Sequence, residues 1–559
     1  MPDNTSQPSF ASESTDAANQ APESSRPAWT IMVYLAGDNN LADECVFALT
    51  EMKAAMIDPS IRVVAQFDPT ARRLKTKRFV LNRALHENGN GNNPNAKPVT
   101  GIDSEAWRHR KSIIDDVVPE GLPPGKTPFR DPSITGAGKL ANPRGQAGVA
   151  TAAAPALAED PDTDSGDPKL LFDFISWTVD NHEADHYVVI LSGHGSGIID
   201  QEFLRDESSS GTLTIKELGE VFNRVKDLRD SRGNAISIDV LGFDSCVMGM
   251  AEVCYELAGT VKYMLSSESF SPQAGWPYGR IIQRLSESLK EPERPTSPEG
   301  LARMAIDEHV DFYLDYAEAN GLSVDLSLLD VSKITALVED VRNLGEVLTA
   351  ALNKGEKEFL DQIVLAHWEA QSYNGELYVD LRDFCDCLRT RYGDPEEANR
   401  TEMGDRASVY QACTNVINRI DHELVKQSCY MGVIFQYSFG VSIYFPWAEI
   451  APDYNEKELK FIDASGWREF LEVYVKATRR KPRGVTTVMD GAGAATTDGT
   501  PTPLMRLDDN IRKTITDQRG PANVLIRSMR NPPIEVVVEG LSECTKERFR
   551  NKEKSTSAS

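Results

Sequence analysis

Residues 236–250, ISIDVLGFDSCVMGM, decide how the rest of the chain is interpreted. Their first half alternates and then runs apolar, which is typical of a buried strand, and from Val247 the apolar positions repeat with helical spacing. The pattern predicts a strand that passes directly into a helix, with Asp244, Ser245 and Cys246 on the turn between them. A cysteine at a helix N-terminus has a lowered thiol pKa, so Cys246 is a candidate nucleophile. The alternative is that Asp244 or Ser245 only caps the helix and that Cys246 is a small buried residue.

A second stretch, HYVVILSGHGSGII at 186–199, carries the candidate base. It is another apolar strand, and it ends in a run of glycines that encloses His194. A histidine between glycines after a strand has an accessible ring and a backbone that a ligand can approach closely. In a parallel sheet both turns would lie at the carboxyl edge, where such sheets bind ligands. His194 precedes Cys246 by about 50 residues, which is the order found in caspases.

With these motifs the chain resembles the clostripain-like cysteine peptidases (peptidase C11), a family with the caspase-type fold. The resemblance covers most of residues 29–475 and rests on the segments WTIMVYLAGDNNLA (29–42), HYVVILSGHGSG (186–197), LGFDSC (241–246), SSESFSPQAGWPY (266–278) and GVSIYFPW (440–447). It implies an α/β fold, a caspase-like, mostly parallel sheet flanked by helices, with a mainly helical C-terminal part. The alternation of strand and helix patterns independently favours such a sheet.

The resemblance also implies roles for single residues. Cys246 would attack the scissile carbonyl and His194 would act as general base or acid, as a dyad without an acidic third member. The backbone N–H groups of Gly195 and Cys246 would form the oxyanion hole. Asp244 would bind a basic side chain of the substrate, with arginine preferred over lysine because a guanidinium binds a carboxylate with two hydrogen bonds. A helix cap is the competing role for Asp244.

The segment 266–278 supplies two further candidates for substrate binding, Glu268 and Trp276. A tryptophan at this edge of the sheet can stack on an extended peptide, and the competing interpretation is that Trp276 packs beneath a turn. In GDNNLA (37–42) we interpret Asp38 or Asn39 as a helix cap rather than as a catalytic group, although this loop can also border the cleft.

Composition narrows the class of partner. The chain of 559 residues has a formal net charge of −25, which argues against nucleic acid and anionic membranes as partners and suits basic peptides. Its 8 cysteines are not densely spaced, which indicates a reducing compartment. We find no apolar run long enough to span a membrane and no leader peptide, so we expect a cytoplasmic protein.

The chain divides into five predicted regions. They are a disordered tail (1–28), a caspase-like peptidase domain (29–330), a helical C-terminal subdomain (331–477) in which strand 440–446 completes the fold, a linker (478–502) and an extension of unknown role (503–559). The peptidase domain contains an insertion at 86–168 without sustained periodicity. This insertion carries basic residues where we expect cleavage by the enzyme itself or by an upstream activating protease: Lys97, Arg108, Arg110, Lys111, Lys126, Arg130, Lys139 and Arg144. The alternative is an insertion without consequence.

We expect neither a metal nor a cofactor. DESSSGTLTIKE (206–217) has the spacing of a calcium loop, but only Asp206 and Glu217 are anionic ligands on the pattern, and a capped helix start explains it more simply. Cys385 and Cys387 have no second pair of ligands nearby. Some members of the family respond to calcium, so binding elsewhere stays open.

The sequence thus predicts a cysteine endopeptidase that cleaves proteins or peptides after basic residues. We add the hypothesis that it is a zymogen, activated by proteolysis in a bacterial signalling or defence cascade. Two alternatives come from other classes, a catalytically inactive caspase-like scaffold and a cysteine acyl hydrolase or amidase that acts on small molecules.

Overall fold

The structure is a computed structural model. It describes residues 26–70, 76–81, 113, 163–199, 202–290, 296–320, 323–392, 404–447, 449–456 and 459–478. Most of the predicted tail and of the 86–168 insertion, nearly all of the linker and the whole 503–559 extension lie outside the described residues.

An eight-stranded sheet forms the centre of the peptidase part, in the order β10-β7-β6-β5-β4-β1-β2-β3. Its strands are β1 (Trp29–Gly37), β2 (Ile61–Pro69), β3 (Lys77–Leu81), β4 (His186–Ser192), β5 (Ile238–Asp244), β6 (Val261–Ser266), β7 (Val324–Asp330) and β10 (Val425–Met431). The five strands β6, β5, β4, β1 and β2 are parallel, and only the outer strands pair antiparallel. The predicted α/β fold with a mostly parallel sheet is confirmed.

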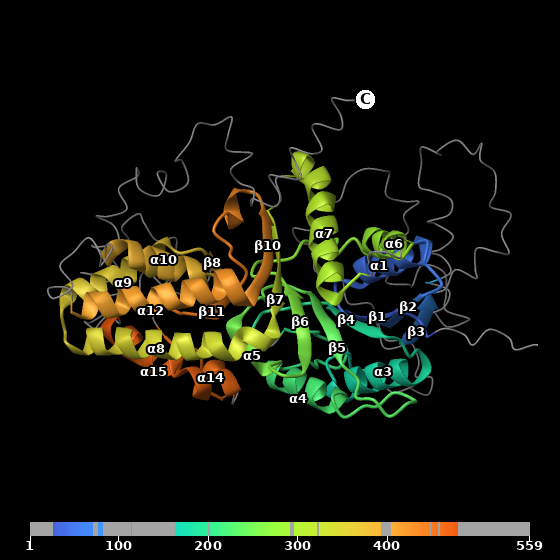
Figure 1. Cartoon of the computed structure of the whole chain (residues 1–559), viewed down its shortest axis with the longest axis horizontal. Helices are drawn as coiled ribbons and strands as arrows, with labels where there is room; N and C mark the ends of the chain where they lie inside the picture. Colours follow the sequence, from blue (N-terminus) through green and yellow to red (C-terminus); the bar gives the residue numbers. More distant parts are fainter. Residues whose placement is uncertain are drawn as a thin grey trace, which may run out of the picture.

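Helices cover both faces of this sheet (Figure 1). Helices α1 (Ala42–Ala54), α6 (Tyr278–Ser288) and α7 (Pro298–Asn320) lie on one face, and α3 (Pro168–Asn181), α4 (Ile215–Val225) and α5 (Ala251–Glu256) lie on the other. Successive side chains of a strand point to opposite faces, so Ile31 and Val33 of β1 join one core while Met32 and Tyr34 join the other. A strand buried on both faces reads as a continuous apolar run, and that run made the central strands visible in the sequence.

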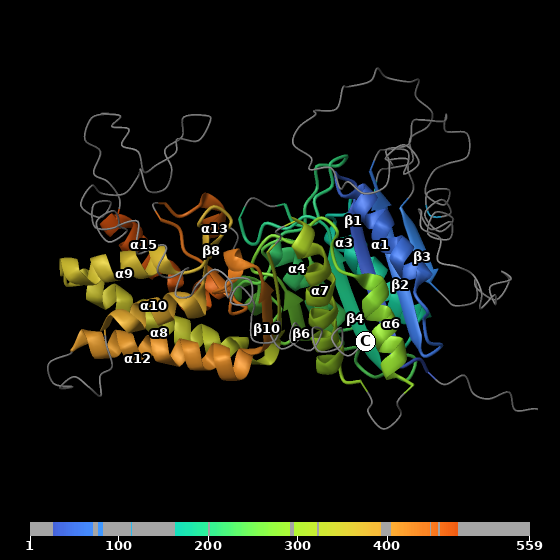
Figure 2. The ribbon, with the colours of Figure 1, turned by 90° about the horizontal axis from the view of Figure 1, so that it is seen from above.

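The C-terminal part lies beside the β10 side of the sheet (Figure 2). Its helices are α8 (Ile334–Asn353), α9 (Lys357–Glu369), α10 (Leu381–Tyr392), α12 (Asp405–Arg419), α13 (Pro452–Glu456), α14 (Lys460–Ser465) and α15 (Trp467–Thr478). A small sheet of order β11-β9-β8 stands among them, formed by β8 (Ser372–Tyr373), β9 (Tyr378–Asp380) and β11 (Ser442–Tyr444). The mainly helical character that we predicted for this part is present.

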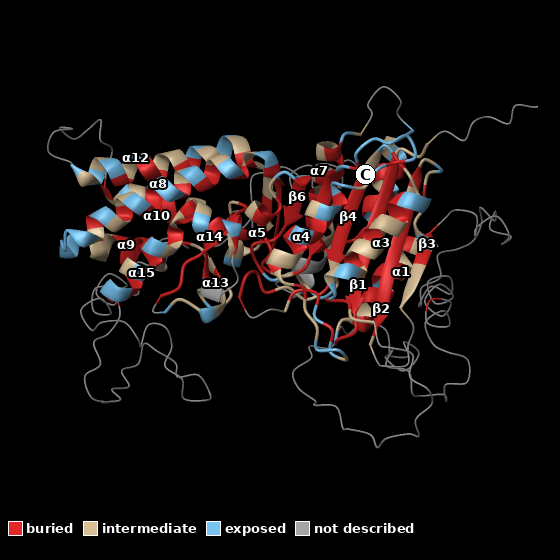
Figure 3. Ribbon diagram, turned by 90° about the horizontal axis from the view of Figure 1, so that it is seen from below, coloured by how far each residue is buried: buried red, intermediate tan, exposed pale blue. Residues whose placement is uncertain are grey.

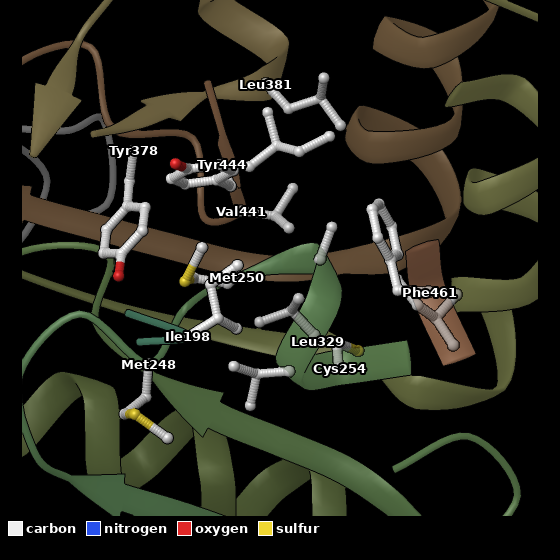
Figure 4. Close-up of a cluster of buried hydrophobic side chains, with 14 of the residues drawn as sticks. Ile198, Met248, Met250, Cys254, Leu329, Tyr378, Leu381, Val441, Tyr444 and Phe461 are labelled. Atoms are coloured by element: carbon white, nitrogen blue, oxygen red, sulfur yellow. The ribbon is translucent and has the colours of Figure 1, made fainter. Parts of the chain in front are cut away.

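The two parts share one hydrophobic core. Met248 and Met250 of the peptidase part lie near Tyr378, Val441 and Tyr444 of the C-terminal part in a single cluster of buried side chains (Figure 4). Buried residues continue from the sheet into the C-terminal helices (Figure 3). The C-terminal part is therefore a support for the peptidase sheet, packed against the segment that follows the candidate nucleophile.

Two strands of the C-terminal region differ from our predictions. Residues 425–431 form β10 of the main sheet, although we predicted mainly helix up to residue 428. The predicted strand 440–446 contains β11, but it pairs with β9 and not with the main sheet. Both β10 and β11 pair with strands distant in the chain, and periodicity within a short segment carries no information about such partners.

The boundary that we predicted for the disordered tail, residue 28, lies too late in the chain, because residues 26–28 are part of the described structure. Arg26 donates a hydrogen bond of 2.6 Å to the carbonyl of Ala184 and forms an ion pair of 2.8 Å with Asp230. The described chain therefore begins before Trp29. A single arginine with partners distant in sequence gives no local signal.

Candidate active site

His194 and Cys246 lie in one cleft because their strands are neighbours in register. Strand β4 pairs parallel with β5, and Ser192 is the partner of Asp244 at the last position of both strands. His194 and Cys246 each follow two residues later, so both emerge at the same carboxyl edge. They line a cleft of about 130 Å³ together with Asn40, Leu41, Glu44, Cys45, Ala48, Ser192, Gly193, Asp244, Ser245, Ser271, Pro272, Gln273, Ala274, Gly275 and Tyr278.

Two glycines of the 193–197 loop are required by close packing. A Cβ on Gly195 would lie 2.5 Å from the carbonyl oxygen and 3.0 Å from the nitrogen of Cys246, so only glycine lets the two backbones meet here. Gly197 has φ +67° and packs against the Met250 sulfur and the Tyr378 ring. The backbones of Gly195 and Cys246, the two predicted donors of the oxyanion hole, are thus in contact.

The turn that bears Cys246 differs from our prediction. Helix α5 begins at Ala251, not at Val247. In the turn between Cys246 and this helix, Val247 has φ +51° and donates its N–H to the carbonyl of Ser269. The N–H of Gly249 donates to the carbonyl of Ser267. Cys246 is therefore held on a turn braced by the segment after β6, and the helix N-terminus that we expected to lower its pKa lies too far along the chain.

Burial favours the neutral forms of both candidate catalytic groups. It raises the pKa of the Cys246 thiol, whose Sγ lies 3.8 Å from the carbonyl oxygen of Ser271. It lowers the pKa of the His194 imidazole; the charge of Arg205 acts in the same direction, and the charges of Glu202 and Glu207 oppose it. The lowered thiol pKa that we expected for Cys246 is therefore contradicted, and burial favours a thiol and a neutral imidazole in this cleft.

Asp244 is a buried carboxylate that borders the cleft. It accepts hydrogen bonds of 2.8 Å from the Tyr278 hydroxyl and 3.2 Å from the Ser192 hydroxyl. Burial raises its pKa, while the bonds from Tyr278, the Trp276 backbone and Ser192 act in the opposite direction. No helix begins at Asp244, so the competing role as a helix cap is excluded.

Glu268 does not reach the cleft, and its predicted role in substrate binding is wrong for this structure. Its side chain is fully buried, and its Oε2 accepts a bond of 2.7 Å from the Gly440 N–H. Burial and the neighbouring Asp380 and Asp325 raise its pKa well above the ordinary value. Residue 268 lies two positions past the end of β6, where its N–H donates to Asp325, and its side chain reaches Gly440 of the C-terminal part.

Trp276 packs in the hydrophobic core and does not line the cleft. Its side chain is 2% exposed, and its ring fills the space that a Cβ on Gly242 would need. It packs among apolar residues beneath the loop that borders the cleft. The structure therefore supports the competing interpretation, a tryptophan packed under a turn.

Three residues of the cleft were missed at the level of sequence. Asn40 Oδ1 lies 2.6 Å from His194 Nε2, Tyr278 orients Asp244, and Ser271 contacts Cys246 through its carbonyl. The GDNNLA loop gave a signal for Asn40, because it follows a buried strand and was expected to border a cleft. The predicted helix cap at Asp38 or Asn39 is wrong, because Leu41 is the N-cap of α1 and no side chain caps it, although Asn39 accepts the N–H of Leu41 within the loop.

The calcium-like loop contains a helix start. Thr214 and Glu217 form a capping box at the beginning of α4, and Asp206 accepts the N–H groups of Ser165 and Ser209. Among the described residues no group of three or more His, Cys, Asp or Glu side chains could hold a metal ion. In that same part of the chain, no helix is both long enough and apolar enough to cross a membrane.

Comparisons with known proteins found a matching family and several similar proteins. The sequence matches the Clostripain family, peptidase C11, over residues 33–474. Clostripain of Hathewaya histolytica is 25% identical over 314 residues, which are 49% of this chain and 53% of the relative, so the chain spans about half the length of that relative. A secreted C11 cysteine protease from Bacteroides thetaiotaomicron, solved with an irreversible peptide inhibitor, is similar at 15% identity and a TM-score of 0.47, over 79% of this chain and 99% of that one. An inactive zymogen C11 protease from Parabacteroides distasonis is similar at 15% identity and a TM-score of 0.44, over 79% and 98%. Since the family match covers most of the sequence, the chain belongs to the clostripain family.

Proposed function

We propose that this protein is a cysteine endopeptidase that cleaves after basic residues, arginine in preference to lysine. The observation that carries the proposal is the shared cleft, in which His194, Cys246 and the buried carboxylate of Asp244 are brought together at one edge of the sheet.

The chemistry follows from the neutral resting pair. When a substrate carbonyl enters the cleft, His194 accepts the thiol proton and the sulfur of Cys246 attacks the carbonyl carbon. The oxyanion accepts hydrogen bonds from the N–H groups of Gly195 and Cys246, and each such donor typically contributes about 3–4 kcal/mol. His194 then gives the proton to the leaving amine, and water hydrolyses the thioester to release the acid and restore the thiol.

Asp244 supports a preference for a basic residue before the scissile bond. The carboxylate is already largely removed from water. Binding a guanidinium therefore adds little to the desolvation of Asp244 itself. Tyr278 and Ser192 both bond one oxygen, Oδ2, and fix the plane of the carboxylate. A planar guanidinium matches a fixed carboxylate better than an ammonium does.

Activation by proteolysis is part of the proposal. The support for it lies in the sequence, since the 86–168 insertion contains the basic residues that the cleft would accept. One relative is described as an inactive zymogen, which makes a dormant form a reasonable state to test. Whether an upstream protease cuts the chain, and whether it acts in a signalling or defence cascade in the cytoplasm, are hypotheses of the same kind. Fractionation of expressing cells would test the location.

The decisive experiment compares wild type, Cys246→Ala and His194→Ala on fluorogenic peptides with Arg, Lys or Ala before the bond, and on small esters and amides. We expect cleavage of the Arg and Lys peptides by wild type alone. Turnover confined to small amides would favour the acyl hydrolase alternative, and no turnover even after limited trypsin treatment would favour the scaffold. Mass spectrometry of the purified wild type beside Cys246→Ala then shows whether the enzyme cuts itself, and where.

A further inference from the structure

Asn40 is placed to control the ring of His194. The connection between β1 and α1 lies beside the His194 loop, because β1 and β4 are parallel neighbours and Leu35 pairs with Ser192. From this connection the side chain of Asn40 reaches across to the histidine, and its Oδ1 lies 2.6 Å from Nε2. This contact joins residues 154 apart in the sequence.

The loop that presents Asn40 is fixed by its neighbours on both sides. The side chain of Asn39 donates bonds of 3.0 Å to the carbonyl of Ala36 and 2.8 Å to that of Arg205, and the hydroxyl of Thr70 donates to the carbonyl of Asn39. The N–H of Glu207 bonds the carbonyl of Asp38. A side chain on so constrained a loop is held in one place without contributing to the core, and Asn40 itself is exposed.

The chemistry of the contact selects one tautomer. An amide oxygen can only accept, so Nε2 of a neutral imidazole must carry the proton that bonds it, and Nδ1 is then the unprotonated nitrogen. We propose that Asn40 is the positioning residue of His194, holding the Nε2–H tautomer so that Nδ1 takes the proton of Cys246. The proposal rests on the catalytic roles of His194 and Cys246 given above.

A neutral partner suits this site. A carboxylate in the place of Asn40 would favour the imidazolium and raise the histidine pKa, whereas burial lowers that pKa in the present site. An amide orients the ring without adding charge, so His194 stays a free base at neutral pH. Asn40 would therefore take the role that an acidic residue has in a catalytic triad.

The experiment compares Asn40→Ala and Asn40→Asp with wild type in kcat, KM and the pH dependence of kcat/KM, on the best basic peptide. For Asn40→Ala we expect kcat to fall about tenfold or more at nearly unchanged KM, because general-base catalysis contributes about 10²–10⁴-fold and depends on ring geometry. For Asn40→Asp we expect the acid limb of the profile to move to higher pH. The control is Asn181→Ala, which also removes an amide hydrogen bond, here to Trp177, at the opposite edge of the sheet and should retain wild-type kinetics.

A direct reading of the ring comes from ¹⁵N NMR of histidine-labelled Cys246→Ala protein, with His194 assigned among the 8 histidines by comparison with the His194→Ala variant. We expect Nε2–H in this protein and a mixture of tautomers once Asn40→Ala is added. An Nδ1–H tautomer in the presence of Asn40, or wild-type kcat in Asn40→Ala with an intact thermal transition, would overturn the proposal. Activity retained by Cys246→Ala would instead overturn the proposed peptidase mechanism, and the NMR result would still decide the role of Asn40.

Discussion

Ser192 and Asp244 are partners in register at the ends of two adjacent parallel strands, and their side chains are joined by a hydrogen bond of 3.2 Å. This pair marks the point at which both strands end at the cleft. Both strands end at the same level, so His194, Cys246 and Asp244 line one cleft. The predictions below follow from this arrangement.

Replacement of Asp244 should lower activity in a way that depends on the substrate. We expect Asp244→Asn to lower transition-state stabilisation, derived from kcat/KM for an arginine peptide, by about 2–5 kcal/mol. The reason is that a guanidinium would then be buried without a countercharge. A peptide with a neutral residue before the bond should change little. The same panel run with Tyr278→Phe, which leaves the carboxylate in place, should show a smaller loss. An equal loss on basic and neutral peptides would remove Asp244 from the binding of the basic side chain.

The thiol of Cys246 should resist alkylation at neutral pH. Because burial raises its pKa, iodoacetamide should react with the free enzyme only as the pH rises past the ordinary thiol value of about 8.5. Because burial lowers the His194 pKa, the acid limb of kcat/KM should lie below about 6.5, with activity present above that limb. Mass spectrometry of the alkylated peptide that contains Cys246, measured across pH with Cys246→Ala as blank, gives the pKa of the thiol. The pH dependence of kcat/KM gives the pKa of the imidazole. Rapid alkylation near pH 6 would instead show a resting ion pair.

Gly195→Ala should cost activity more than it costs stability. The added Cβ would meet the backbone of Cys246 and displace the two N–H groups proposed for the oxyanion, so we expect a loss of about a hundredfold in kcat. Gly300→Ala is the matched control, since Gly300 lies in helix α7 and an added Cβ meets only the flexible Ser297 and Thr296 side chains. Kinetics and thermal unfolding of both variants test this expectation. Full activity in Gly195→Ala would contradict the position of the oxyanion hole.

The buried carboxyl pair of Glu268 and Asp380 should make stability depend on pH. Each is fully buried and the charge of Asp380 acts on Glu268, so ionising both is unfavourable, and burial, with the charge of Asp383, raises the pKa of Asp380 to about 8. The unfolded carboxyl loses its proton near pH 4, so unfolding releases a proton between about pH 4 and 8, and the free energy of unfolding falls as the pH rises through this window. The slope approaches about 1.4 kcal/mol per pH unit for one proton.

Glu268→Gln tests that expectation, because an amide of the same shape still accepts from Gly440 but carries no ionisable group beside Asp380. Urea unfolding between about pH 5 and 9 should show a flatter dependence in this variant than in wild type. Glu220→Gln, on the exposed surface of α4, should keep the wild-type slope. Parallel curves for Glu268→Gln and wild type would show that the pair does not hold the proton.

The elements that local pattern could predict are those with a continuous apolar run or an amphipathic period. The strands around residues 186–192 and 238–244 were predicted within a residue or two, because each is buried on both faces. The pairing of His194 with Cys246 was also accessible, since two strands of one parallel sheet must end at one edge. The start of α5 was misjudged because Val247 and Met250 are buried on a turn and imitate a helical face.

The sequence by itself determined the fold class, the family and the two loops that bear an imidazole and a sulfur, because these depend on residues close together along the chain. Only the tertiary structure decided that burial raises the thiol pKa, that Trp276 and Glu268 face away from the cleft, and that Asn40 reaches the histidine. Burial and long-range hydrogen bonds set these properties, and both arise from atoms that meet only after the strands have paired.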